Sequence, residues 1–175
     1  MRSTILAVPT KADKRPSSTV AKLGQRGAFL LSQLGYHSAT RCAELLAPLD
    51  LQPAHYGVLT HLTAAEGLSQ QQLADLLGVH RNVMVGILDE LEARKLVRRE
   101  RDPNDRRAHR IHLTPRAHEV LRQANMTIDG LEENMFACLT PSEHDQIVGL
   151  LRRLADSADL PTGIHPGLRY RNRAR

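Results

Sequence analysis

The side chains with the most evident chemistry are cations gathered in one short stretch. Between Arg94 and Arg110, eight cations stand against three anions, so this stretch has a net charge of +5, equal to the formal net charge of the whole chain. Such density favours a partner with closely spaced negative charges, such as the phosphates of a nucleic acid. The eight cations are Arg94, Lys95, Arg98, Arg99, Arg101, Arg106, Arg107 and Arg110.

The cations surround a predicted β-hairpin. Residues 96–101 and 110–114 form two short runs, and the second alternates apolar and polar side chains. The residues between them begin Asp-Pro-Asn-Asp at positions 102–105, which is typical of a tight turn. The pattern therefore predicts two antiparallel strands joined by a basic tip.

Two short helices are predicted just before this hairpin. Ser69 is a suitable N-cap, Gln72 completes a capping box, and Gly78 ends the helix because glycine enters the left-handed region cheaply. The second helix begins near His80. Its inner face is expected to carry Met84, Ile87, Leu88 and Leu91, and its outer face Asn82, Val83, Gly86 and Glu90. A helix-turn-helix followed by a hairpin is typical of a domain that binds duplex DNA.

The outer face supplies candidate base contacts. Asn82 can pair with the N6 and N7 edge of adenine, although it can instead cap the helix or contact a phosphate. Val83 can contact a thymine methyl group. Gly86 leaves room for close approach of the backbone to DNA.

The start of each helix supplies candidate phosphate contacts. Arg81 is the only early cation of the second helix. His80 can bind a phosphate or cap this helix. Ser69 and Gln70 stand at the start of the first helix, where backbone amides commonly hold phosphate.

Residues 51–121 resemble the MarR family of bacterial winged-helix regulators, and helix order extends the resemblance to about residues 26–155. Four positions depart from it. Relatives usually carry Ser or Thr in place of His80 and often Thr in place of Val83, and they often carry Arg or another polar side chain in place of Gly86 and a cation in place of Glu90. The departures favour methyl contact and shape readout over guanine readout. The matching residues are Leu73-Ala74, Leu77-Gly78-Val79, Asp89-x-Leu91-Glu92, Leu96-Val97, Asp102-Pro103-x-Asp105-Arg106-Arg107 and Leu113-Thr114.

The resemblance implies roles for the hairpin tip. Arg107 matches the wing arginine that relatives place in the minor groove, where a narrow A·T-rich groove attracts it. Asp105 would orient this arginine or stiffen the loop. Arg106 is the neighbouring phosphate contact. The alternative is that the hairpin tip is an ordinary surface loop exposed to solvent, without a role in DNA binding.

The resemblance also implies a homodimer and a small effector, often an aromatic acid or phenol, bound between the dimer arms and the winged domain. Arg41 can pair with a carboxylate there, and the other side chains can line a pocket. The alternative is ordinary helix surface. The matching region holds Tyr36, His37, Arg41, His55, Tyr56 and His61.

Apolar stripes outside the winged core independently predict a two-fold dimer. Helical patterns at 26–46, 53–62, 115–138 and from Pro141 onward carry more leucine and isoleucine than a core of this size needs. A two-fold axis would bury these stripes and place two reading helices about one DNA turn apart.

The expected fold is mostly α: a winged helix-turn-helix core with a two-stranded β wing, flanked by N- and C-terminal dimerisation helices. We expect a disordered basic tail at 1–25, a regulator at 26–160 and a flexible basic tail at 161–175. Within the regulator, 26–50 and 115–157 are the dimerisation arms and 51–114 the DNA-binding core.

Composition narrows the classes of function. The chain has 175 residues, 3% aromatic residues, no Trp and a sequence pI of about 9.7, which favours helical packing and an anionic partner. No stretch approaches the roughly 20 apolar residues of a membrane span, and the apolar run from Ile5 to Val8 is too short for a secretory signal, so a cytoplasmic location is expected. No catalytic motif, cofactor-binding loop or clear metal-ligand set is present, so neither an enzyme nor a cofactor is expected.

The sequence thus predicts a cytoplasmic, sequence-specific double-stranded-DNA-binding transcriptional regulator. We expect a homodimeric repressor on a pseudo-palindromic operator, released by an aromatic or phenolic effector. Redox sensing through Cys42 stays open, as does metal sensing through His109 with His112, or His112 with His118. A winged helix that binds only protein is the alternative from another class.

Overall fold

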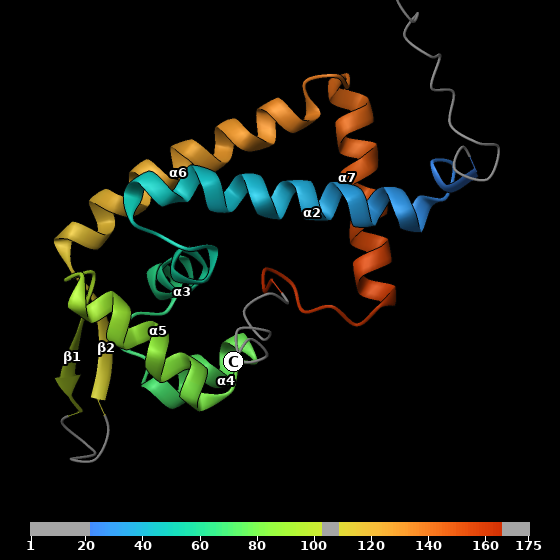
Figure 1. Cartoon of the computed structure of the whole chain (residues 1–175). Helices are drawn as coiled ribbons and strands as arrows, with labels where there is room; N and C mark the ends of the chain where they lie inside the picture. Colours follow the sequence, from blue (N-terminus) through green and yellow to red (C-terminus); the bar gives the residue numbers. More distant parts are fainter. Residues whose placement is uncertain (1–21, 103–108, 166–175) are drawn as a thin grey trace, which may run out of the picture. The chain divides into compact units, whose positions relative to one another are not determined.

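A computed structural model describes residues 22–102 and 109–165 of the chain. The chain divides between Ala39 and Thr40 into two units, Met1–Ala39 and Thr40–Arg175. The helices are α2 (Gly27–Leu46), α3 (Pro53–Ala64), α4 (Gln70–Leu77), α5 (Arg81–Ala93), α6 (Pro115–Phe136) and α7 (Pro141–Ser157), with a short 3-10 turn, η1, at Ala47–Leu49 (Figure 1). The strands are β1 (Val97–Arg101) and β2 (His109–Leu113).

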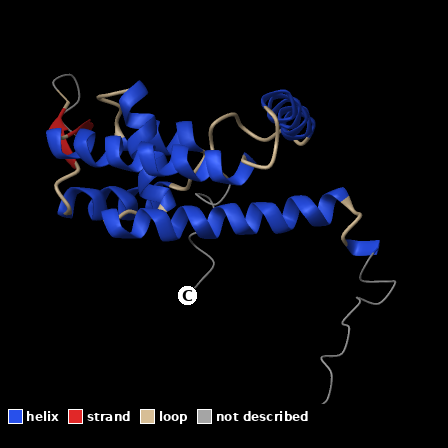
Figure 2. Cartoon of the chain, turned by 90° about the horizontal axis from the view of Figure 1, so that it is seen from above, coloured by secondary structure: helices blue, strands red, loops and turns tan. Residues whose placement is uncertain are grey.

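The predicted fold class is confirmed: the chain is mostly helical, with a winged helix-turn-helix. The strands are antiparallel and pair Val97 with Leu113 and Arg101 with His109. They lie at one end of the second unit, beside helices that form most of it (Figure 2). Ser69, just before α4, forms an isolated antiparallel β-bridge with Arg110 of β2, so one residue pair extends the pairing beyond the two strands.

Local capping sets where the helices begin. Ser69 Oγ accepts from the backbone amide of Gln72, whose side chain accepts from the amide of Ser69, as the predicted capping box requires. Thr140 and Glu143 form the same capping box at α7, whereas Thr114 caps α6 only by accepting from the backbone amide of Ala117, and each threonine precedes a proline in the first helical turn. The observed starts of these two helices agree with the predicted starts, and α6 ends two residues before the expected end.

One apolar core joins α3, α4, α5, α6 and the strands within the unit Thr40–Arg175. It also includes the last residue of α2, Leu46, which is fully buried. Burying each such leucine stabilises the folded state by about 2 kcal/mol. The core therefore holds α4, α5 and the two strands, the elements expected to contact DNA, in one geometry. Its largest fully buried apolar members are Leu46, Val58, Leu59, Leu62, Leu73, Leu77, Met84, Ile87, Leu88, Leu91 and Ile111.

Two helical faces stay outside this core. In the part of α2 that belongs to Met1–Ala39, Leu30, Leu31 and Leu34 are each more than two-fifths exposed. On α7, Leu150 and Leu154 are about half exposed. In the described part of the chain, no helix has the length and apolar character needed to cross a membrane.

Candidate nucleic-acid interface

The helix-turn-helix consists of α4, a tight turn and α5. Gly78 ends α4 at φ 60°, where its lack of a Cβ avoids strain. Val79 is buried after the turn, and His80 caps α5: its Nδ1 accepts from the backbone amide of Asn82 at 3.2 Å. Of the two roles open to His80 in the sequence, the structure therefore shows the cap.

The first two turns of α5 present a mostly uncharged surface. Arg81, Asn82 and Gly86 are exposed. A Cβ added at Gly86 would meet no heavy atom within 4 Å, so the space beside this backbone is open. A DNA edge can approach the helix closely at this position.

The expected outer position of Val83 is wrong. Val83 is only 9% exposed and belongs to the core. It lies four residues before Ile87 and eight before Leu91, so it continues the same buried row. The apolar arc of α5 is wider than the sequence pattern suggested, and we assign Val83 no base contact.

Ion pairs join the wing to the reading helix. Arg99 of β1 approaches Asp89 of α5, with Nη2 2.6 Å from Oδ1, and a second nitrogen contacts Glu92. Burial alone would lower the pKa of Arg99, but the bonds to Asp89 and Glu92 outweigh it and raise this pKa. The guanidinium therefore stays charged and fixes β1 on α5.

A second pair joins the two sides of the hairpin at the tip end of the strands. Nε of Arg110 lies 2.9 Å from Oδ2 of Asp102, across the two strands. The predicted residues Asp105, Arg106 and Arg107 lie outside the described residues.

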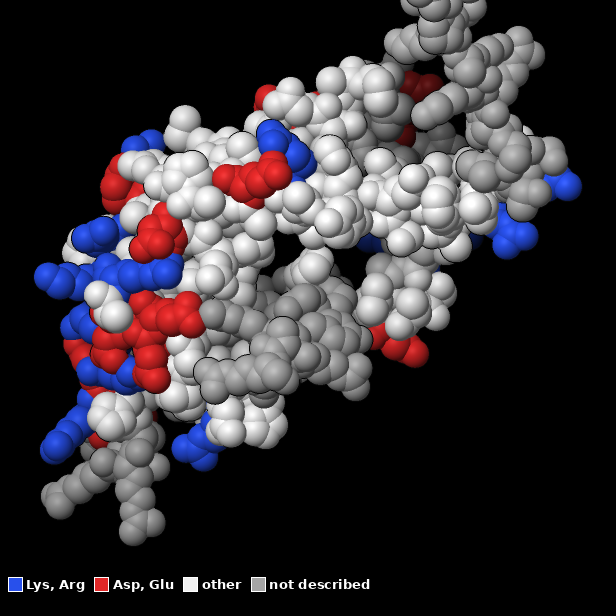
Figure 3. All heavy atoms as spheres, in the orientation of Figure 1, with Lys and Arg blue, Asp and Glu red and all other residues white. Residues whose placement is uncertain are grey.

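Pairing changes the expected charge distribution. Arg94, Arg98, Arg99 and Arg110, half of the eight cations counted in the sequence, each face a carboxylate. Figure 3 shows acidic and basic side chains intermingled at the end that carries α5 and the strands. Of the described cations between Arg81 and Arg110, those that form no ion pair are Arg81, Lys95 and Arg101.

The expected effector residues belong to both units of the chain. Tyr36 and His37 are exposed in Met1–Ala39, and Arg41 is paired with Glu44. His55 is fully buried, so the expectation that it lines an effector pocket is wrong. Its ring fills a core position at the start of α3 and bonds to protein atoms on both nitrogens.

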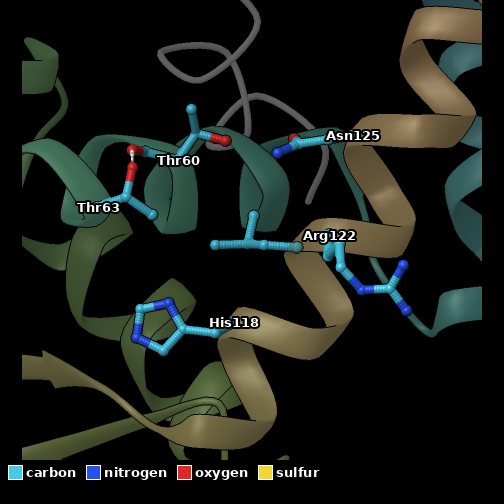
Figure 4. Close-up of a pocket in the computed structure, with 6 residues that line it drawn as sticks. Thr60, Thr63, His118, Arg122 and Asn125 are labelled. Atoms are coloured by element: carbon cyan, nitrogen blue, oxygen red, sulfur yellow. Dashed lines mark hydrogen bonds between the residues drawn. The ribbon is translucent and has the colours of Figure 1, made fainter.

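A pocket of about 240 Å³ lies instead between α3 and α6. Figure 4 shows Thr60 and Thr63 facing it from α3, and His118 and Asn125 from α6. Tyr56 reaches its edge, because the phenol donates to Asn125 Oδ1 at 2.9 Å. Burial raises the pKa of this phenol, so it remains a donor. The lining residues are Thr60, Thr63, His118, Leu121, Arg122 and Asn125.

Sequence reasoning missed this pocket because its residues come from two helices far apart in the chain. Thr60 and Thr63 share one face of α3 at a spacing of three residues, and His118 and Arg122 share one face of α6 at a spacing of four. Those spacings are readable in the sequence. The packing of the two faces against each other is not.

The cysteines lie in different surroundings. Cys42 is half-buried, and burial raises the pKa of its thiol, while Cys138 is exposed. A raised thiol pKa lowers the fraction of reactive thiolate. Within the described segments, no three His, Cys, Asp or Glu side chains gather as a metal site would require.

The comparisons with known proteins agree on one family. The MarR family profile matches residues 49–108. A putative transcriptional regulatory protein for the hcr operon of Thauera aromatica is 32% identical over 102 residues, which span 58% of this chain and 61% of that relative.

Solved structures extend the likeness over most of the chain. The transcriptional repressor CouR bound to a 23-mer DNA duplex has a TM-score of 0.69 and 29% identity, over 78% of this chain and 96% of that one. CouR from Rhodococcus jostii bound to p-coumaroyl-CoA has a TM-score of 0.65 and 30% identity, over 82% of this chain and 98% of that one. With a winged helix-turn-helix of this geometry, the chain belongs to the MarR family of transcriptional regulators.

Proposed function

We propose that this chain binds a specific duplex DNA sequence as a homodimer and regulates transcription by occupying an operator. The observation that carries the proposal is the exposed start of α5, which presents Arg81, Asn82 and the open backbone at Gly86. The other face of this helix is buried in the core, which holds α5 rigidly. Exposed polar groups on a rigid helix suit base readout in a major groove. The DNA duplex bound by the CouR relative supports this choice of partner.

The amide of Asn82 is the principal base contact in this proposal, and Arg81 contacts phosphate beside it. Gln70 lies in the first turn of α4, where helices leave backbone amides without intrahelical partners. Those amides and the Ser69 end of α4 bind a second phosphate. These contacts set the register, and α5 reads the bases.

The wing is proposed to contact the adjacent minor groove. The Arg99 bridge to α5 fixes the direction in which the hairpin leaves the helix-turn-helix, and the Asp102–Arg110 pair holds the two sides of the hairpin together near its tip. Arg101 is exposed at the end of β1. Arg106 and Arg107 follow in sequence and are proposed to bind phosphate and the minor groove, with Asp105 orienting them.

Exposed apolar side chains support the homodimer. Leu150 and Leu154 are 47% and 53% exposed on one face of α7, and α2 exposes a leucine row of its own. Single exposed leucines are common, but rows of them on two helices indicate an interface. Replacing Leu150 and Leu154 with Glu should give a monomer by light scattering, whereas Arg152→Glu on the opposite, exposed face of the same helix should leave the dimer intact.

The effector is proposed to bind at the pocket between α3 and α6. Its polar lining suits the oxygens of a small aromatic acid or phenol, and Leu121 offers an apolar surface for the ring. The p-coumaroyl-CoA bound by CouR is an aromatic acyl compound of related chemistry. Binding would release DNA only if the ligand prefers the arrangement that does not fit the operator.

Selection of duplexes from a random pool tests the proposed function directly. The purified chain should enrich a pseudo-palindrome and bind it at least about 10³-fold more tightly than unrelated duplex at equal salt. Enrichment of no sequence, with equal affinity for all duplexes, would contradict it and favour a protein-binding winged helix.

A further inference from the structure

A buried histidine contacts the reading helix α5 near its C-terminal end. His55 stands in the first turn of α3 and is fully buried. Its Nε2 lies 2.9 Å from Oε2 of Glu90 on α5. The contact joins residues 35 positions apart in the sequence and holds two helices of the helix-turn-helix core together.

The other ring nitrogen of His55 identifies the tautomer. Nδ1 accepts from the backbone amide of Gln52 at 3.1 Å. Since Nδ1 is the acceptor, Nε2 carries the proton and donates to the Glu90 carboxylate. The ring is therefore neutral in this arrangement, and its single N–H points at the reading helix.

Arg94 connects the same ring to the turn that follows α2. Its Nη1 lies 3.4 Å from Nδ1 of His55. The same guanidinium donates to the carbonyl oxygen of Asp50, and its Nε lies 3.4 Å from the Asp50 carboxylate. Asp50 follows η1 in the left-handed region at φ 54°, so this turn has a defined shape.

We propose that His55 and Glu90 are a positioning pair that sets the orientation of α5 and couples it to the α2–α3 junction. The chain of contacts runs from Asp50 through Arg94 and His55 to Glu90. Arg94 itself caps the end of α5, so a displacement of the turn after α2 reaches the reading helix directly through Arg94 and also, through His55, at Glu90 one turn earlier. The inference rests on the proposed DNA-binding function and adds a route for its regulation.

The pair also accounts for the carboxylate on a DNA-reading helix. An anion facing phosphate would oppose binding, but the Glu90 side chain is only 38% exposed and bonds to His55. One oxygen of this carboxylate is thus directed at the buried ring of His55. The carboxylate positions the helix and need not contact DNA.

A double-mutant cycle tests the pair. His55→Phe keeps a ring without nitrogen donors, and Glu90→Ala removes the acceptor. Each should lower the ratio of operator affinity to non-specific affinity by about tenfold, and the double variant should lose no more than the worse single. His61→Phe is the control, because within the described residues the half-buried His61 bonds only to the Gly57 carbonyl oxygen of its own helix.

Other outcomes would overturn the proposal. A lower melting temperature with an unchanged affinity ratio shows that the pair only stabilises the fold. Additive losses show that the two residues act independently. If His55→Phe does not fold, the comparison of Glu90→Ala with Glu90→Gln tests the pair. The glutamine amide oxygen still accepts from His55, so Glu90→Gln must keep the parent ratio of operator affinity to non-specific affinity, whereas Glu90→Ala must lower it.

Hydrogen exchange separates this inference from the proposed function. Without DNA, the amides of α5 should exchange faster in Glu90→Ala than in the parent chain, with those of α6 unchanged. If the parent chain shows no operator preference, the proposed function fails, and exchange still tests the pair. Equal exchange in α5 for both chains contradicts the pair itself.

Discussion

Arg99 of β1 and Asp89 of α5 tie the wing to the reading helix, with Nη2 of the arginine 2.6 Å from Oδ1 of the aspartate. Glu92, one turn further along α5, contacts the same guanidinium. One side chain thus sets the angle between the two elements that are proposed to enter adjacent grooves.

Removing this link should weaken DNA binding through geometry. Arg99→Ala should lower operator affinity about tenfold, because the wing then samples orientations that do not fit the minor groove. Arg98→Ala is the matched control, since Arg98 lies on the same strand and pairs with Glu100 of that strand. Fluorescence anisotropy measures both, and equal losses would show that only charge matters.

The readout proposed for Asn82 predicts a change in base preference. Asn82→Ala should lose discrimination at one A·T pair in each half-site, worth about 1–3 kcal/mol. Arg106→Ala should weaken all duplexes alike, because a phosphate contact carries no base information. Repeating the duplex selection with each variant makes the comparison. An unchanged preference in Asn82→Ala removes this residue from the readout.

The sequence was informative where local chemistry decides the structure. The capping box of Ser69 and Gln72, the left-handed Gly78 and the prolines at the starts of α6 and α7 set element boundaries that agree with the prediction to within a few residues. Each depends on neighbours within a few positions, so the pattern suffices.

The sequence was less informative where distant elements meet. The width of the apolar arc on α5 depends on what packs against Val83, and the surroundings of Glu90 depend on a histidine at the start of α3. A count of arginines likewise ignores the carboxylates that face them, such as Asp89 and Asp102. Ionic and packing partners across the fold cannot be read from spacing along one helix.

Lys95 marks a site of local strain. It follows the end of α5 at φ 59°, where a side chain costs about 1 kcal/mol relative to glycine. Lys95→Gly should therefore raise the free energy of unfolding by up to about that amount. Lys95→Ala keeps the Cβ and should give no such gain. Urea denaturation compares them, and equal stabilities would show that the turn is unstrained.

The start of α7 predicts a pH effect. Hydrogen bonds from the Thr140 backbone amide and side chain lower the pKa of Glu143 below its ordinary value of 4.5. Because the folded-state pKa is lowered, the stabilisation is present above about 4.5 and is lost as the pH falls through the folded-state value.

The Glu143→Gln variant checks this effect. The amide keeps a capping acceptor but cannot titrate, so its melting temperature should fall less than that of the parent chain between pH 6 and pH 3. Circular dichroism follows both transitions. Parallel decreases in the two chains would place the acid sensitivity elsewhere.

Hydroxyl-radical footprinting on the selected duplex tests the central claim, that two α5 helices of a homodimer read one operator. The account predicts two protected segments whose centres lie about one helical turn, or 34 Å, apart, and their joint loss in the Leu150→Glu, Leu154→Glu variant. A single protected segment, or the same two segments at parent affinity from that variant as a monomer, would contradict it.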